Sequence, residues 1–151
     1  MDGILHEGDY VNNVLVLDSQ LRSSLAIIRS LGRKGINVSA GSEYVFSTGA
    51  LSKYSQERFL LPNPQKNSES FIDSLTKILQ NKSYDCIFTS RTLTAYLLSR
   101  YQKELSAYTK VPIPRSEVFE TAYLKEKTLK IAEQDNISVP KIYTEKEVNY
   151  E

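Results

Sequence analysis

The sequence predicts an α/β fold in which helices cover both faces of a mainly parallel sheet. Two observations lead to this prediction. Short aliphatic runs such as residues 14–17 lack polar alternation, which is typical of strands that are buried on both faces. Between such runs, apolar residues recur at helical spacing, so strands and helices alternate along the chain. The expected architecture is a Rossmann-like, doubly wound sheet that binds ligands at the carboxyl ends of its strands, followed by a carboxy-terminal helix–strand overhang.

Turn and cap residues define the elements of the first half. In chain order they are a central strand at residues 14–17, a helix from about residue 21 to 35, a strand at 36–40 that runs into Gly41 and Ser42, a short helix at 49–54 and a short strand at 58–61. Asp18 or Ser19 should cap the first helix, and Gly35 should end it in a left-handed conformation. The end of the second strand should then face the loop that follows the first strand.

The second half repeats the alternation of helix and strand. In chain order we expect a helix from Asn67 or Ser68 to about residue 81, a buried strand at 85–89, a helix from Thr92 through Leu105, an edge strand at 111–114, a short helix capped by Ser116, and a last helix from Lys125 to a break at Asn136. Pro112 and Pro114 confine their strand to an edge, because proline has no N–H to give to a central ladder.

Composition and charge limit the classes of function. The 151 residues, 40% hydrophobic and 25% charged, fit one globular domain with a short overhang. The 19 basic and 18 acidic residues give a net charge of +1, which provides no bulk attraction to nucleic acid or acidic lipid. The single cysteine, Cys86, excludes an internal disulfide and favours a reducing compartment. No apolar run is long enough to span a membrane, and residues 1–8 do not resemble a signal peptide, so we expect a cytoplasmic protein.

The loop after the first strand is a candidate ligand site. Its hydroxyl, amide and guanidinium groups lie at the start of a predicted helix, where free N–H groups and the helix dipole favour an anion. The glycines of a dinucleotide-binding loop are absent, which disfavours NAD. The candidate substrate-binding residues of this loop are Ser19, Gln20, Arg22 and Ser23. Helix capping by the serines and simple solvation of Arg22 are the alternatives.

Other candidates follow the second and third buried strands. Ser42 ends one strand, and Arg91 and Thr92 follow the next, where a guanidinium suits a carboxylate or a phosphate. Cys86 lies in an apolar run, distant in sequence from His6, and reads as a buried hydrophobe. Neither a catalytic acid–base pair nor a metal-ligand spacing is recognisable, so we predict no catalytic residue and no metal site in this chain.

Several short motifs, each common by itself, together resemble one enzyme family. They are Leu31-Gly-Arg-Lys-Gly35, Ser52-Lys-Tyr54, Pro62-Asn-Pro64, Tyr84-Asp85 and a last helix that starts at Lys125 and runs into Ile137-Ser-Val-Pro140. From about residue 14 to 141 the chain resembles the amino-terminal (pre-ATP-grasp) domain of an ATP-grasp ligase, of the carbamoyl-phosphate-synthase-like or carboxylate–amine ligase subgroup. Convergent turns in an unrelated doubly wound fold are the alternative.

The resemblance implies a role for Lys125, which corresponds to the family's lysine that contacts the phosphates of ATP. Leu124 replaces the usual acid before it, and Asn136 replaces the glycine at the helix end, a mild change because Asn tolerates a left-handed stop. Where the family often has an acid after the strand at 85–89, this chain has Ser90-Arg91-Thr92, which places any amine or metal contact there in doubt. The implied domains are a tail at 1–13, the pre-ATP-grasp domain at 14–122, and the start of the nucleotide-binding half at 123–151.

The implied full-length enzyme uses ATP and Mg²⁺ to join a carboxylate to an amine. Its second lysine, its glycine-rich flap and its late Glu and Asn ligands have no counterpart up to Glu151, so this chain alone should hold neither cofactor. The expected partners are the missing ATP-grasp half, a small carboxylate or amine substrate, and a second copy in a homodimer. Without that half, residues 125–143 should lack their main packing partner and residues 144–151 should be poorly ordered.

Two further hypotheses stay open beside the ligase. The chain is alternatively a stand-alone regulatory module that binds a small anion or nucleotide through Arg22, Ser23 and Arg91. The other hypothesis is a scaffold that dimerises through a strand edge or a helix face.

Overall fold

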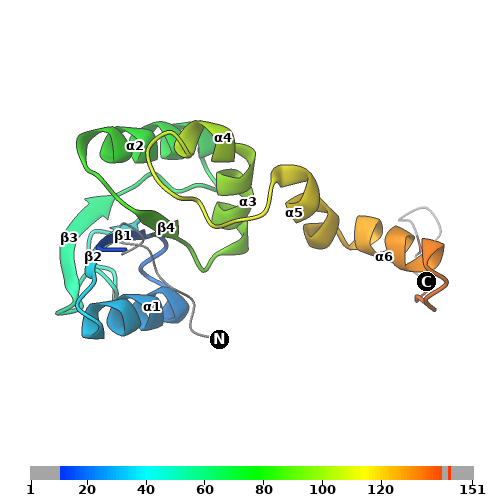
Figure 1. The fold of residues 1–151 in the computed structure, drawn as a ribbon, viewed down its shortest axis with the longest axis horizontal. Coiled ribbons are helices and arrows are strands. Elements are labelled where there is room, and N and C mark those ends of the chain that lie inside the picture. The colour runs from blue at the N-terminus through cyan, green and yellow to red at the C-terminus, as the bar shows by residue number, and fades with distance from the viewer. Residues whose placement is uncertain (1–10, 141–142, 144–151) are drawn as a thin grey trace, which may run out of the picture. The chain divides into compact units, whose positions relative to one another are not determined.

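A computed structural model of the protein describes residues 11–140 and residue 143 (Figure 1). The chain divides into two compact units, Met1–Ser116 and Glu117–Glu151. The expected tail at 1–13 falls largely outside the described residues, and the expected loose end at 144–151 falls wholly outside them. Among the described residues, no helix is both long and apolar enough to cross a membrane.

The first unit is built on a four-stranded sheet with the order β3-β2-β1-β4. Its strands are β1 (Asn13–Val16), β2 (Asn37–Ser42), β3 (Ser55–Leu60) and β4 (Cys86–Phe88). All neighbouring strands are parallel, with Val14 opposite Val38 on one side and opposite Cys86 on the other. The first strand is therefore central, and the predicted α/β fold with a parallel sheet is confirmed.

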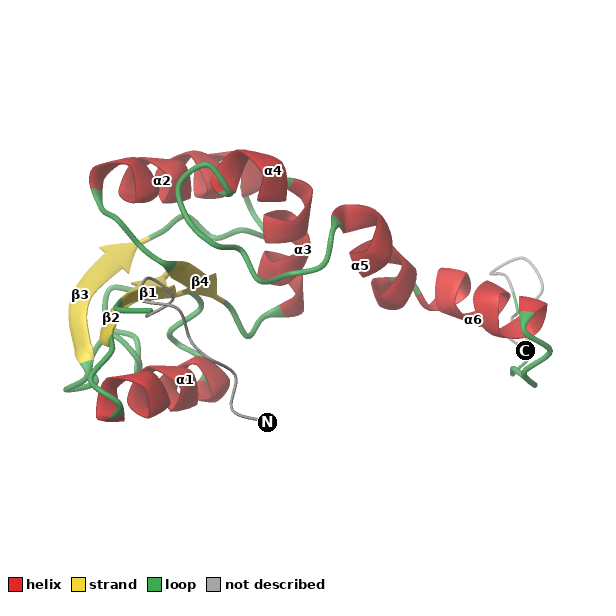
Figure 2. Ribbon diagram, viewed as in Figure 1, coloured by secondary structure: helices red, strands yellow, loops and turns green. Residues whose placement is uncertain are grey.

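Helices cover both faces of this sheet (Figure 2). They are α1 (Arg22–Arg33), α2 (Ser68–Asn81), α3 (Thr92–Arg100) and α4 (Gln102–Leu105). Successive side chains of a strand point to opposite faces, so Leu15 and Leu17 pack with α2, α3 and α4, whereas Val14 and Val16 pack with Ile28 of α1. Each of these side chains is almost fully buried, and each burial contributes roughly 1.5–3 kcal/mol to the stability of the fold.

The ends of the helices confirm some cap predictions and correct one. Asn67 is the N-cap of α2, and its side chain accepts a 2.9 Å hydrogen bond from the N–H of Ser70. Gly35 has a φ of 80°, as expected for a left-handed stop. The prediction that Asp18 or Ser19 caps α1 was wrong: the N-cap is Leu21, without a side-chain bond. The side chains of Asp18 and Ser19 instead make other hydrogen bonds, to Thr89 and Thr94 and to Ser47, respectively.

Three predicted elements differ from the structure. Residues 49–54 form turns, not a helix, because the hydroxyl of Ser47 and nearby carbonyls accept the N–H groups there. The helix predicted from Thr92 through Leu105 is broken at Tyr101 into α3 and α4. The edge strand predicted at 111–114 is reduced to one bridge between Lys110 and Cys86, because the prolines beyond it cannot donate.

The second unit contains most of α5 (Ser116–Tyr123) and all of α6 (Lys125–Gln134). Neither helix has a buried residue. The predicted helix end at Asn136 is confirmed, since this residue has a left-handed φ of 57°. Residues 137–140 have no regular secondary structure, and the rest of the predicted overhang strand begins at residues 141–142, outside the described part.

Candidate functional site

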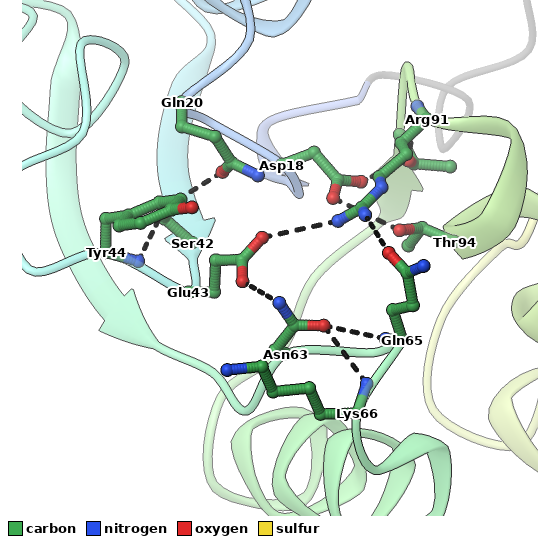
Figure 3. A network of polar contacts seen from close by, with 11 residues as sticks. Asp18, Gln20, Ser42, Glu43, Tyr44, Asn63, Gln65, Lys66, Arg91 and Thr94 are labelled. Atoms are coloured by element: carbon green, nitrogen blue, oxygen red, sulfur yellow. Dashed lines mark hydrogen bonds and ion pairs between the residues drawn. The ribbon is translucent and has the colours of Figure 1, made fainter.

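Polar side chains gather at the carboxyl ends of the parallel strands (Figure 3). Asp18 lies two residues beyond β1, Glu43 directly follows β2, and Arg91 lies in the loop between β4 and α3. Gln65 comes from the loop between β3 and α2. Loops that follow neighbouring parallel strands meet at one edge of the sheet, which is where open α/β folds bind ligands.

Asp18 is the most constrained residue of this edge. Its φ of 53° is left-handed, a conformation that Asp and Asn tolerate better than most residues. The side chain is buried, and its carboxylate accepts hydrogen bonds from the hydroxyls of Thr89 (2.6 Å) and Thr94 (3.1 Å). Burial raises the pKa of the Asp18 carboxyl above its ordinary value, while the two hydroxyl bonds oppose this rise. The backbone conformation and the two hydroxyl bonds together hold the Asp18 carboxylate at this edge of the sheet.

Arg91 connects the loops that follow β2, β3 and β4. Its Nη1 lies 3.3 Å from Glu43 Oε1, and its Nη2 donates to Gln65 Oε1 at 3.3 Å. The other carboxylate oxygen of Glu43 accepts a hydrogen bond from the side-chain amide of Asn63. The side chains of Arg91 and Glu43 are 26% and 13% exposed, so this ion pair is partly shielded from water. A guanidinium has five N–H donors, and the two contacts above use only part of that capacity.

The loop after β1 is joined to the end of β2. The hydroxyl of Ser42 donates to Gln20 Oε1 at 2.9 Å and accepts a bond from the N–H of Tyr44 at 3.0 Å. This contact confirms the expectation that the second strand ends opposite the loop after the first. Gln20 and Ser42 therefore lie at the same edge as Asp18 and Glu43.

A small cavity lies between these groups. It measures about 10 Å³, and its walls include Asp18, Gln20, Ser42 and Glu43 together with apolar residues below them. This volume is room for about one water molecule. Four polar residues thus contribute to the wall of this space, which is otherwise apolar.

The structure brings only some of the predicted site residues together. Gln20, Ser42 and Arg91 lie at the edge described above. Ser19 is fully buried, and its hydroxyl bonds to that of Ser47 at 2.6 Å. Ser23 donates a 2.7 Å bond to Ser90.

Arg22, Thr92 and Lys125 are placed differently. Arg22 is exposed at the start of α1, and Thr92 is the exposed first residue of α3. Lys125 is the exposed first residue of α6, in the second unit. None of these positions adds a group to the cavity wall.

Sequence reasoning missed Asp18 and Glu43 as site residues. Asp18 was assigned to a helix cap, although its position at the end of a buried strand was a signal for the edge site. Glu43 gave a weaker signal, because its partner Arg91 is 48 residues away and only the strand order brings the two together.

This edge combines two acidic side chains with one guanidinium. Asp18 and Glu43 accept hydrogen bonds from a cation or a donor, and Arg91 donates to an anion. Among the described residues, no group of three or more His, Cys, Asp or Glu side chains is arranged to hold a metal ion. Cys86 is buried, and burial raises the pKa of its thiol, which disfavours the nucleophilic thiolate.

Comparisons with known proteins reveal a similar fold. No protein-family model and no curated protein matches the sequence. The crystal structure of L-amino acid ligase from Bacillus licheniformis matches 85% of this chain with a TM-score of 0.69 and 16% identity. The structure of glycinamide-RNase-transformylase T from Mycobacterium tuberculosis matches 82% of it with a TM-score of 0.57 and 18% identity. This chain spans 31% and 35% of those chains, respectively, and the likeness is one of fold.

Proposed function

We propose that this chain is the amino-terminal part of an ATP-dependent ligase that joins a carboxylate to an amine, of the carbamoyl-phosphate-synthase-like subgroup of ATP-grasp proteins. In this proposal the first unit contributes part of the substrate site, and residues from Lys125 onward begin the nucleotide-binding half. The cytoplasm is the proposed compartment. The full-length polypeptide would use ATP and Mg²⁺.

The observation that carries the proposal is the fold likeness to the L-amino acid ligase, which extends over 85% of this chain and 31% of that one. A match of this extent is what an amino-terminal part of a longer enzyme would give. The motifs that suggested the same family from sequence support it independently. The left-handed Asn136 supports the comparison of this helix end with the family's glycine.

The start of α6 supports a phosphate-binding role for Lys125. The N-cap of α6, Leu124, gives no side-chain hydrogen bond to the first turn, although its carbonyl accepts the N–H of Lys127 at 2.9 Å. A cation at the positive end of a helix is unfavourable, although Glu126 in the same turn offsets part of this cost. Phosphate groups accept N–H bonds and neutralise the ammonium.

The proposed reaction proceeds in two steps. An oxygen of the substrate carboxylate attacks the γ-phosphorus of ATP, and the bond between this phosphorus and the β-phosphate oxygen breaks. The products of this step are an acyl phosphate and ADP. The amine nitrogen then attacks the acyl carbon, and inorganic phosphate leaves with the electron pair of the broken C–O bond. The nitrogen loses a proton and becomes an amide.

Turnover by the natural full-length polypeptide tests the proposal. With ATP, Mg²⁺, a panel of carboxylates and hydroxylamine, we expect carboxylate-dependent release of ADP and formation of an acyl hydroxamate. Lys125→Ala should lower turnover by about a hundredfold, the scale for loss of a charge-stabilising group. Lys127→Ala is the matched control, because Lys127 lies on the same helix and pairs with Glu120 at 3.0 Å. ADP release that no carboxylate stimulates would contradict the proposal.

One observation favours a second candidate, the stand-alone binding module. Every residue of the edge site belongs to the compact unit Met1–Ser116. A binding module needs no nucleotide half to present these groups. Tight binding of a nucleotide by this chain alone, measured by calorimetry, would favour the module over the ligase.

A further inference from the structure

We propose that residues 1–10, an acidic segment, bind along α1 of the same chain and cover three arginines there. These arginines, Arg22, Arg29 and Arg33, are all exposed, and we call them the arginine stripe. While the acidic segment is bound, the stripe is withheld from other anions. The inference concerns a surface that the proposed function does not use, and it does not depend on that function.

The arginine stripe is a straight line along α1. Its members are seven and four residues apart, and both spacings return to nearly the same side of a helix. At a rise of about 1.5 Å per residue, the stripe is about 16.5 Å long. Ser24 and Ile28 are the buried residues of α1, and they lie on the other side of the helix. The stripe therefore faces away from the sheet.

Nothing within α1 balances the charge of the stripe. Residues 19–42 include four basic side chains and no Asp or Glu. Arg29 and Arg33 are one helical turn apart, a spacing at which like charges repel each other. In the described part of the chain, none of the three arginines forms an ion pair. An anionic segment along the stripe would offset this repulsion.

A groove follows the same side of the helix. It has a volume of about 690 Å³, and the three arginines are part of its wall. Ala26 and Ser30 also line the groove, and their side chains are small, so the backbone of a bound segment can approach α1 closely. Leu25 adds apolar surface. The groove therefore offers guanidinium donors and apolar contacts together.

The acidic segment carries complementary groups in the same order. It contains three acids and neither Lys nor Arg. Its acids and apolar residues follow each other as Asp2, Ile4, Leu5, Glu7 and Asp9. The corresponding order on α1 is Arg22, Leu25, Ala26, Arg29 and Arg33. From the first acid to the last, an extended chain reaches about 23 Å, which is enough to cover the 16.5 Å (about 11 residues at 1.5 Å) of the stripe.

The acidic segment joins the described structure beside the end of α1. The carbonyl of Asn12 accepts the N–H of Asn37 at 2.8 Å. Asn37 is the first residue of β2 and follows the C-cap of α1, Lys34, by three residues. Asp9 precedes Asn12 by three residues, a reach of about 10 Å. Asp9 can therefore meet Arg33 while the preceding residues continue toward the start of the helix.

The start of α1 suits the other end of the acidic segment. The N-cap, Leu21, makes no side-chain cap bond, and the first turn of α1 contains no acidic residue. A carboxylate is favoured at this end of a helix because of the helix dipole. Asp2 would supply that carboxylate beside Arg22.

The tether makes up for the weakness of the individual contacts. An exposed ion pair contributes little by itself. A segment joined to the domain by a short linker has, however, an effective concentration on the order of millimolar at a nearby site. The contact should therefore be populated at low salt and should weaken as salt is added.

Paramagnetic relaxation in amide NMR spectra of the 151-residue chain tests the inference. A nitroxide is attached at Ser30→Cys, an exposed position beside the stripe, and the native Cys86 is buried. We expect broadening of the amides of Leu5 and Glu7. The same label at Lys77→Cys is the matched control, because Lys77 is exposed on α2, on the other face of the sheet, and should leave these amides sharp (Figure 1).

Removal of charge should release the acidic segment. In the double variant Arg29→Gln/Arg33→Gln, broadening at Leu5 should fall about threefold, because the tethered acids have lost their partners. The double variant Lys77→Gln/Lys103→Gln removes two exposed charges elsewhere and should change nothing. Raising the ionic strength from about 0.05 to about 0.5 M shortens the Debye length from about 14 to about 4 Å, and should act like the loss of the arginines.

A short polyglutamate peptide tests whether the segment covers the stripe. In a variant with the changes Asp2→Asn, Glu7→Gln and Asp9→Asn, the peptide should bind about fivefold more tightly than in the wild type, because the stripe is then open. Adding Arg29→Gln/Arg33→Gln to this variant should abolish that gain. A dispersed amide spectrum identifies the variants that have folded.

Four results would overturn the inference. They are sharp amides at Leu5 and Glu7 in the Ser30→Cys sample, broadening that survives in Arg29→Gln/Arg33→Gln or at high salt, and equal affinity of the peptide for the wild type and the acid variant. The fourth is broadening in a mixture of spin-labelled ¹⁴N chains with unlabelled ¹⁵N chains, since the segment would then bind α1 of a second copy. None of these measurements involves turnover, so failure of the ligase proposal leaves them unaffected.

Discussion

Gly32 lies against Tyr54 so closely that a Cβ atom at residue 32 would come within 2.5 Å of the Tyr54 Cβ. The two residues belong to the motifs Leu31-Gly-Arg-Lys-Gly35 and Ser52-Lys-Tyr54. Gly32 lies near the end of α1, and Tyr54 immediately precedes β3. One motif therefore needs its glycine because of the tyrosine in the other.

Gly32→Ala should destabilise the fold. In an exposed helix, this change would stabilise by about 0.5–1 kcal/mol, because alanine loses less backbone entropy than glycine. Here the added methyl meets the Cβ and ring of Tyr54, and overpacking of this kind costs about 1–3 kcal/mol. Urea unfolding measures the difference, with Ser30→Ala on the exposed face of α1 as control. An unchanged or higher midpoint for Gly32→Ala would refute the close packing.

Asp18→Asn should raise stability at neutral pH. Burial raises the pKa of Asp18, so the folded protein holds this proton at a pH where the unfolded chain has lost it. Stability therefore falls as pH rises from the ordinary carboxyl pKa through the raised one, and Asn removes that loss. Asn also tolerates the left-handed φ of 53° at this position. The gain should shrink as the pH of urea unfolding is lowered, and a gain that is constant with pH would contradict this explanation.

Asp85→Asn should show the opposite dependence on pH. The carboxylate of Asp85 accepts bonds from the backbone N–H groups of Asn13 (2.8 Å) and Asn12 (2.7 Å), which lower its pKa. The stability it contributes is present above the ordinary carboxyl pKa and is lost as pH falls through the lowered one. The variant should therefore be less stable than the wild type near pH 7 and equal to it in strong acid. Asp73→Asn, an exposed change on α2, is the control for the loss of one carboxylate.

The amides of α6 should exchange with solvent much faster than those of α2. None of the residues of α6 is buried, whereas α2 buries Phe71, Ile72, Leu75 and Leu79. An isolated helix of this length is marginal in water, so its hydrogen bonds open readily without apolar packing. Hydrogen exchange with mass spectrometry of a dilute sample measures both helices at once. Equal protection would show that α6 packs stably within this chain and would count against Lys125 as the start of a separate nucleotide half.

The sequence predicted most of the fold because its signals are local. The aliphatic runs at β1 and β4, the Asn67 cap and the left-handed Gly35 each depend on neighbouring residues. The turns at 49–54 were mistaken for a helix because their composition allows either. The N–H of Gly49 bonds the carbonyl of Ser19, a contact between distant segments that a local pattern does not reveal.

The site was less predictable than the fold. Polar residues after strands were expected to meet, and Gln20, Ser42 and Arg91 do lie at one edge. The charged residues of the edge are brought together by pairings between distant segments, such as that of Glu43 with Arg91. Such pairings are not visible in the sequence. A buried hydroxyl such as that of Ser19 looks the same in sequence as one that faces a ligand, because only the direction of its side chain differs.

The two edges of the sheet differ in how readily they pair with a further strand, and Gln102 is one cause of this difference. Its side-chain amide donates to the carbonyls of Val111 and Ile113, and the prolines beside these residues have no N–H to offer. The segment next to β4 therefore has few backbone N–H and C=O groups that could pair with a further strand. In the part of the chain that the structure describes, β3 forms the opposite margin, with no strand paired to its outer side. Self-association through backbone pairing, whether orderly or as aggregation, would begin at β3.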